Sequence, residues 1–232
     1  MRQIVLDTET TGLEAGKGHR IIEIGAVELA ERRPTGRKFH RYVNPQRAID
    51  NGALAVHGIN NEFLADKPTF AEVARELIDF IAGAELIIHN AAFDVSFLDA
   101  EFALADAQFG RVADHSQVLD TLTLAREKYP GQKNSLDALC KRLNIDNSHR
   151  ELHGALLDAQ LLADVYLAMT GGQGDLAFAG ETLYAPRVLP SAARPMLRVR
   201  MADMAELALH EMRLTRLADI SKGRCLWRLA VN

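Results

Sequence analysis

The chain has 232 residues, of which 48% are apolar and 25% are charged, the balance of a soluble globular protein with one or two domains. Its two cysteines form no CxxC pair, so neither a disulfide framework nor a zinc site is indicated. No apolar run has membrane-spanning length or resembles a secretory signal, so we expect a cytoplasmic protein without membrane contact. Because the net charge is −4, we do not expect the protein to bind nucleic acid strongly without a partner or metal ions.

Three strands are predicted first, at residues 3–6, 21–29 and 39–43, and turn-rich stretches at 12–20 and 32–36 separate them. Helices and short strands then alternate: a helix from the capping box of Thr69 and Glu72 to Gly83, a strand 85–88, a helix from Asn90 as its cap to about Ala105, a strand 117–119, a helix capped by Asn134 or Ser135, and a helix 154–169. This order indicates an α/β fold with a mixed sheet flanked by helices.

The last part of the chain differs in composition. Residues 173–195 hold three of the seven prolines among small residues, which is typical of a linker. Residues from about 199 to 220 then follow a helical pattern in which Met201, Met204 and Met212 share a stripe. A single helix cannot bury its own apolar face, so this segment needs a docking surface on its own domain or on another protein.

Two carboxylates follow the first strand. Asp7 and Glu9 are two residues apart, so on a strand their side chains project to the same face. Like charges held this close are unfavourable unless a cation binds between them. The pair is therefore either part of a metal site or a solvated acidic turn.

Two further acids stand at predicted helix starts. Asp94 falls in a first turn, where the helix dipole alone would favour it. Asp158 lies in line with Leu161 and Leu162 on an inward face, so it must be paired, hydrogen-bonded or metal-bound. His153 is five residues earlier and cannot share that face of a regular helix, so it is either an ordinary surface histidine or a base on the preceding loop that reaches over a site.

The order of these segments resembles the DEDDh exonuclease superfamily, which has a ribonuclease H-like fold. The run from Asp7 to Leu13 is similar to its first motif, the run from Asn90 to Asp94 to its second, and the run from His153 to Asp158 to its third. Within the superfamily, the chain is most similar to the epsilon, or proofreading, family of bacterial DNA polymerase III, and the resemblance extends over the whole chain.

The resemblance implies a metal-dependent 3′→5′ exonuclease that removes nucleotides from single-stranded or frayed 3′ ends of DNA. The four acids and His153 would be catalytic, and the acids would hold two divalent cations, Mg²⁺ or Mn²⁺, as hard oxygen ligands do. Asp7 would bridge both ions, Glu9 and Asp158 would complete the first site, Asp94 would serve the second, and His153 would take the proton of the attacking water. The resemblance places these residues at the substrate: Asp7, Glu9, Thr10, Gly12, Leu13, His57 and Asp158.

It also implies an adaptor tail, so we expect an exonuclease domain at 1–172, a linker at 173–195 and a polymerase-binding tail at 196–232. Gln173, Leu176 and Phe178 resemble the bacterial sliding-clamp-binding peptide, although the same residues could pack on their own domain. The tail would bind the alpha (polymerase) subunit of DNA polymerase III. The alternatives are a DEDDh exoribonuclease or oligoribonuclease, an inactive adaptor between clamp and polymerase, and an unrelated acidic-site metal hydrolase.

Overall fold

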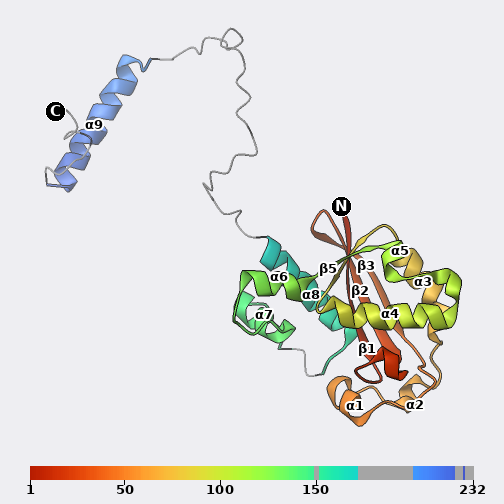
Figure 1. Ribbon diagram of the computed structural model, residues 1–232. Coiled ribbons are helices and arrows are strands. Elements are labelled where there is room, and N and C mark those ends of the chain that lie inside the picture. Colours follow the sequence, from red (N-terminus) through yellow and green to blue (C-terminus); the bar gives the residue numbers. More distant parts are fainter. Residues whose placement is uncertain (149–151, 172–200, 223–226, 228–232) are drawn as a thin grey trace, which may run out of the picture. The chain divides into compact units, whose positions relative to one another are not determined.

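The computed structural model describes residues 1–148, 152–171, 201–222 and 227. The chain divides into two units, Met1–Phe178 and Ala179–Asn232 (Figure 1). None of the described helices is both long enough and apolar enough to cross a bilayer.

A mixed sheet forms the centre of the first unit, as predicted. Its five strands are β1 (Arg2–Thr10), β2 (Ile21–Ala30), β3 (Arg33–Tyr42), β4 (Glu85–Ile88) and β5 (Gln117–Asp120). They lie in the order β3-β2-β1-β4-β5, in which β1, β2 and β3 are antiparallel while β4 and β5 run parallel to β1.

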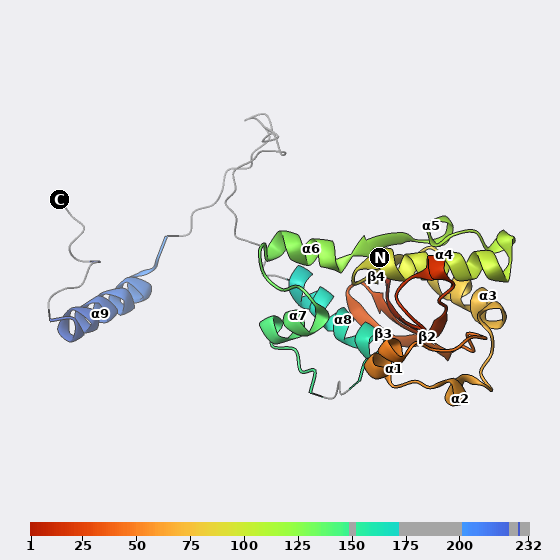
Figure 2. The same ribbon diagram turned by 60° about the horizontal axis from the view of Figure 1, so that its bottom comes forward.

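Helices cover both faces of this sheet. The described α-helices of the unit are α1 (Asn51–His57), α2 (Asn61–Leu64), α3 (Phe70–Ile81), α4 (Ala91–Ala105), α5 (Val112–His115), α6 (Thr121–Lys128), α7 (Leu136–Leu143) and α8 (Ala155–Thr170), and short 3-10 helices lie at Ala15–Lys17 and Ala107–Phe109. Figure 2 shows α3 and α4 on one side of the sheet and α8 on the other. Alternate residues of β1 face these two layers: Ile4 and Leu6 pack with α3 and α4, whereas Val5 packs with α8.

Several predicted ends are confirmed. Thr69 and Glu72 form the capping box of α3, and Gly83 follows the helix with a φ of 70°. Ser135 caps α7, because its side chain accepts a hydrogen bond from the backbone of Ala138. Local side-chain chemistry determined these helix starts, so the sequence alone was sufficient to find them.

The turn predicted at 32–36 was wrong. Strand β3 begins at Arg33, paired with Ala30, after a two-residue turn formed by Glu31 and Arg32. Both turn residues have positive φ, 49° and 62°, which is the geometry that a tight hairpin needs. Glycine or asparagine usually supplies this geometry, so the composition did not show the turn.

The predicted position of Asn90 at the N-cap of α4 is confirmed, but its side chain does not cap the helix. Asn90 precedes α4, but its backbone is left-handed (φ 64°) and its side chain makes no capping hydrogen bond. Its backbone N–H instead donates to Asp120 Oδ1, at 3.1 Å. The prediction also missed the helices α1, α2, α5 and α6, which have four to eight residues each.

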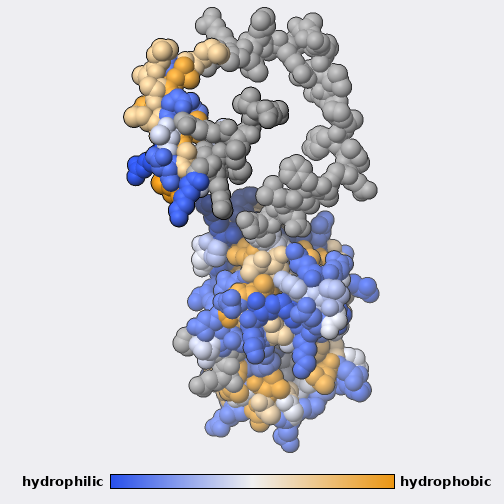
Figure 3. Space-filling view, turned by 90° about the vertical axis from the view of Figure 1, so that its left-hand side faces the viewer, coloured by the Kyte–Doolittle hydropathy of each residue, from blue (hydrophilic) through white to orange (hydrophobic). Residues whose placement is uncertain are grey.

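The described part of the second unit contains α9 (Met204–Ile220), which begins later than predicted. Asp203 and Glu206 form a capping box at its start, so Met201 lies outside the helix. No residue of α9 is buried, and Figure 3 shows hydrophobic and hydrophilic side chains side by side on it. Trp227 is exposed as well.

Candidate active site

The site begins where β1 extends beyond its neighbour. Pairing of β1 with β4 stops at Val5 and Ile87, whereas pairing of β1 with β2 continues to Thr10. The last residues of β1 therefore have a strand on one side and an opening on the other. By the alternation of the strand, Asp7 and Glu9 share the face of Val5, toward α8, and Thr8 lies on the face of α4.

Asp94 enters this opening from the first turn of α4. Its Oδ1 accepts hydrogen bonds from the backbone N–H of Thr8 (3.1 Å) and from Thr8 Oγ1 (2.7 Å). Burial raises the pKa of Asp94 to about 7, the hydrogen bonds from Thr8 oppose that rise, and the charge of Asp120 adds to it. A cation beside this carboxylate would favour its ionised form.

Asp158 comes from the other face, and Gly25 determines how close it comes. Gly25 is the register partner of Asp7 on β2. A Cβ atom on Gly25 would lie 2.1 Å from the backbone nitrogen of Leu156, so the first turn of α8 rests directly on the backbone of β2. This close approach brings the buried Asp158 beside β1.

A carboxylate from β2 also fixes the start of α8. Glu23, the register partner of Glu9, is buried and accepts a hydrogen bond from the backbone N–H of Ala155 at 3.1 Å. Its other oxygen lies 2.7 Å from Nε2 of His40 on the edge strand β3. An acid is favoured at a helix start because the first N–H groups have no partner within the helix.

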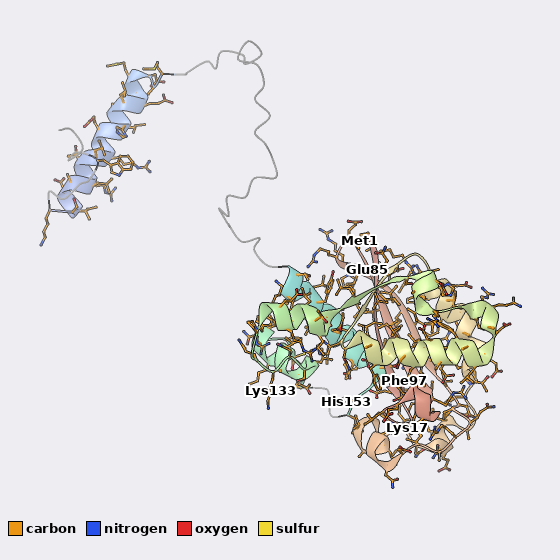
Figure 4. All side chains as sticks on the ribbon, in the orientation of Figure 1. Met1, Lys17, Glu85, Phe97, Lys133 and His153 are labelled. Atoms are coloured by element: carbon orange, nitrogen blue, oxygen red, sulfur yellow. The ribbon has the colours of Figure 1, made fainter. Side chains whose placement is uncertain are left out.

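His153 lies two residues before α8, on the preceding loop, which is the position that a base reaching over the site would need. Its backbone N–H donates to the carbonyl of Val56 in α1, at 3.2 Å, and its side chain is 46% exposed. Its Nδ1 is 3.8 Å from Asp158 Oδ2, and Glu9, His153 and Asp158 each offer one ligand atom within 4.8 Å of the others. Figure 4 labels His153 on the segment that enters α8.

All five residues line one cleft of about 700 Å³. The structure thus brings together, from β1, α4, α8 and the loop before it, these residues: Asp7, Glu9, Asp94, Asp158 and His153. Carboxylate oxygens are the ligands that Mg²⁺ and Mn²⁺ prefer, and no cysteine is among the described residues of this cleft. The residues present therefore fit a divalent cation.

A second, more apolar pocket of about 490 Å³ adjoins the first and shares Thr8, Glu9 and Phe93 with it. The residues that sequence placed around the substrate line it: Thr10, Gly12, Leu13 and His57. Leu13 is 82% exposed. His57 is buried, its Nδ1 accepts from the backbone N–H of Ile59, and among the described residues its Nε2 has no hydrogen-bond partner.

His19 supports this second pocket and was missed in the sequence. Its Nδ1 is 3.1 Å from Thr11 Oγ1, its Nε2 is 3.6 Å from Asp50 Oδ2, and its ring occupies the space where a side chain on Gly12 would lie. The backbone N–H of Asp50 in turn donates to the Thr11 carbonyl. His19 thus connects the loop that carries Leu13 to the start of α1, and no local motif marks such a contact.

The clamp-like residues Gln173, Leu176 and Phe178 lie outside the described part of the chain. The structure therefore does not bear on their predicted role.

Known proteins resemble this chain in fold and in sequence. Residues 4–166 match the exonuclease family. DNA polymerase III subunit epsilon of Escherichia coli (strain K12) is 55% identical, over 98% of this chain and 97% of the relative, and that of Pasteurella multocida (strain Pm70) is 51% identical, over 97% and 93%. A solved structure of exonuclease X in complex with 5′-overhanging duplex DNA is 28% identical with a TM-score of 0.54, covering 73% of this chain and 93% of that one. The five-stranded mixed sheet flanked by helices is ribonuclease H-like, and the chain belongs to the family of exonucleases that includes the epsilon subunits of bacterial DNA polymerase III.

Proposed function

We propose that this protein is the proofreading 3′→5′ exonuclease of a bacterial replicative DNA polymerase III and releases 5′-mononucleotides from mispaired or single-stranded 3′ ends. The observation that carries the proposal is the convergence of four carboxylates and His153 on one cleft, next to a pocket of about 490 Å³. That volume suits a single nucleoside.

The acids hold the cations. Asp7 would contribute to both ion sites, Glu9 and Asp158 would complete one of them, and Asp94 would serve the other. Two divalent cations, Mg²⁺ or Mn²⁺, would supply the positive charge that activates the attacking water and stabilises the leaving 3′ oxygen. His153 stands exposed at the rim, beside Asp158, and takes the proton of the water.

The second pocket holds the terminal nucleotide. Leu13 packs against the last base, the backbone of Thr10 and Gly12 approaches the sugar, and His57 also lines the pocket. A base must leave the duplex to enter this pocket. Unpairing costs least at a mismatch or in a single strand, so frayed ends are the preferred substrate.

Digestion of a primer with a mispaired 3′ end, with and without Mg²⁺, tests the proposal. We expect metal-dependent release of mononucleotides by the wild type, none by Asp7→Ala or Glu9→Ala, and slow release by His153→Ala with metal binding retained. Asp79→Ala, which removes an exposed acid of α3 outside both pockets, serves as the control. A fully active Asp7→Ala protein would end the assignment.

Two alternatives are separated by related measurements. A DEDDh ribonuclease would use the same acids, so oligonucleotides that differ only in a 3′-terminal ribose or deoxyribose distinguish the two substrates. The names of the relatives favour DNA. An inactive adaptor would release no nucleotide under any metal condition.

Helix α9 is proposed to bind the polymerase subunit as part of the tail 196–232. Its exposed apolar side chains include Leu207, Leu209 and Met212, and a lone helix of this kind is stable only when a partner covers apolar side chains of this sort. Tethering of this kind also suits an acidic protein, because a bound subunit gains effective concentration without relying on its charge.

The peptide Gln173 to Phe178 is proposed to bind the sliding clamp, and its sequence supports this role. Titration of the clamp with the full chain and with a Leu176→Ala, Phe178→Ala double variant tests it. We expect the double variant to bind much more weakly, because both apolar anchors are lost. Unchanged affinity would refute the role of the peptide.

A further inference from the structure

The cleft continues past the acids, away from the nucleotide pocket. Its far wall is formed by α6, by the loop before α7 and by the start of α7, with the residues Leu122, Arg126, Gln132, Asn134, Ser135 and Asp137. In Figure 4, Lys133 of this loop and His153 lie along the same edge of the domain, and Figure 3 looks onto the side that carries α6 and α7. None of the proposed catalytic steps uses this wall.

The direction of the substrate follows from the two pockets. When the terminal nucleotide fills the pocket beside Leu13, its 5′ phosphate lies over the acids that both pockets adjoin. The rest of the strand must then leave along the remaining part of the cleft, past α6 and α7. A polyanion on this path meets Asp137 and the four acids, so it needs a positive group to hold it.

Arg126 is that group. It is exposed on α6, and among the described residues that line the cleft it is the sole lysine or arginine. It makes no hydrogen bond or ion pair to any residue of the described chain, whereas Arg20 is bonded to Glu101, and Arg142 to Asn134 and to the Lys133 carbonyl.

The position of Arg126 is supported from the floor of the cleft. His89 lines the same cleft, and its Nδ1 is 3.0 Å from Thr121 Oγ1 at the start of α6. Arg126 lies five residues further along the same helix and lines this cleft together with His89. The bond from Arg142 to Asn134 holds the neighbouring part of the wall in place.

We propose that Arg126 binds the phosphate of the linkage next to the scissile one, on its 5′ side, so that the wall formed by α6 and α7 is a backbone subsite for the DNA strand. The proposal rests on the proposed function. A guanidinium can hold a phosphate with two parallel hydrogen bonds, and such a contact positions the strand without reading its bases. Through Arg126 the exonuclease can therefore bind the backbone of a DNA strand of any sequence, although the rest of the cleft is acidic.

The test compares two substrates. The p-nitrophenyl ester of thymidine 5′-monophosphate offers one phosphodiester and no upstream phosphate, whereas a short oligothymidylate offers both. For Arg126→Ala we expect the ratio of kcat/KM for the oligonucleotide to that for the ester to fall by about tenfold or more, mainly through KM. Arg126→Lys should fall less, because it keeps the charge but loses the paired geometry.

Lys128→Ala is the matched control, because it removes an exposed cation of the same helix that does not line the cleft. The salt dependence gives a second readout: the slope of log(kcat/KM) for the oligonucleotide against log salt should become shallower by about 0.7 in Arg126→Ala. An unchanged ratio and slope would overturn the proposal, and so would equal losses on both substrates, which would place Arg126 in the metal centre or the fold. A wild type that cleaves neither substrate would instead refute the proposed function.

An uncharged methylphosphonate at the first linkage upstream of the scissile phosphate tests the position. We expect this replacement to weaken the wild type about as much as Arg126→Ala does, and to weaken Arg126→Ala little further. Equal weakening of the two proteins by the replacement would overturn the assignment of Arg126 to that phosphate.

Discussion

Replacement of Gly25 by alanine would test how the two halves of the acid cluster are brought together. The new Cβ would lie 2.1 Å from the nitrogen of Leu156 and 2.2 Å from the carbonyl carbon of Ala155, both in the backbone of α8. An ordinary contact begins at 3.4 Å, so the first turn of α8 would have to retreat by about 1.3 Å. Asp158 would move with that turn, whereas Asp7 and Glu9 would stay on β1.

The expected consequences differ in size. Overpacking of this kind costs about 1–3 kcal/mol of stability, which a domain with a core on both faces of its sheet can tolerate. A displacement of about 1 Å in a catalytic group costs about 100-fold in rate. We therefore expect a folded Gly25→Ala protein whose kcat/KM on a short oligonucleotide falls by about 100-fold, with weaker Mn²⁺ binding in calorimetry.

Gly16→Ala is the control, because a Cβ at Gly16 has no neighbour within 4 Å. Thermal unfolding of both variants shows whether a loss of activity comes from unfolding of the domain or from displacement of Asp158 in a folded protein. A Gly25→Ala protein with wild-type activity and wild-type Mn²⁺ affinity would refute the reasoning that the contact between β2 and α8 determines the spacing of the acids. Should Gly25→Ala fail to fold, Glu23→Ala, which releases the start of α8 without adding bulk, is expected to lower kcat/KM in the same direction.

Four further predictions concern the surroundings of the site. Thr8→Val removes the 2.7 Å hydroxyl bond to Asp94 and should weaken Mn²⁺ binding by about tenfold in calorimetry, with unchanged affinity counting against the bond. His19→Ala should raise KM for an oligonucleotide about fivefold while leaving Mn²⁺ affinity within about twofold. His19→Asn, which can still reach Thr11, should raise KM less. If His19→Ala weakened oligonucleotide binding and Mn²⁺ binding equally, a role in the nucleotide pocket would be contradicted. The hydrogen bonds from Thr69 lower the pKa of Glu72, so the capping box stabilises the fold fully above the ordinary carboxyl pKa of 4.5. The difference in Tm between the wild type and Glu72→Ala should therefore narrow as the pH falls below 4.5, and a difference that stays constant with pH would contradict this assignment. Deletion of 196–232 should leave kcat/KM on short single strands within about twofold and abolish co-elution with the polymerase subunit in gel filtration, and a surviving complex would exclude the tail as the binding segment.

The acids could be named from sequence because the three segments that carry them resemble the motifs of one exonuclease superfamily, whereas the local pattern of each acid left a structural alternative open. Asp7 and Glu9 alternate along a strand, Asp94 follows a buried strand into a helix, and Asp158 interrupts an apolar stripe. Each of these patterns depends on the period of one element, which the sequence shows directly. The mixed sheet was predicted from the order of the strands and helices that these hydrophobic periods indicate.

The supporting residues could not be found in this way. The contact of Gly25 with α8 depends on the register of β1 and β2 and on where a helix 130 residues later packs. His19 and Arg126 lie in segments with no motif, and their roles depend on which other side chains surround them. The start of β3 was missed because two charged residues adopt the left-handed turn geometry that other residue types usually supply.

The packing of α8 on β1 and β2 also affects when the enzyme can act during its synthesis. The first two strands leave the ribosome early, but Asp158 lies in α8, the last helix that the structure describes in the first unit, and α8 packs on both strands. A nascent or prematurely terminated chain that ends before this helix lacks Asp158 and therefore holds at most three of the four acids. The proposed site therefore predicts that hydrolysis of DNA requires α8 and that unfinished copies of the chain are inactive.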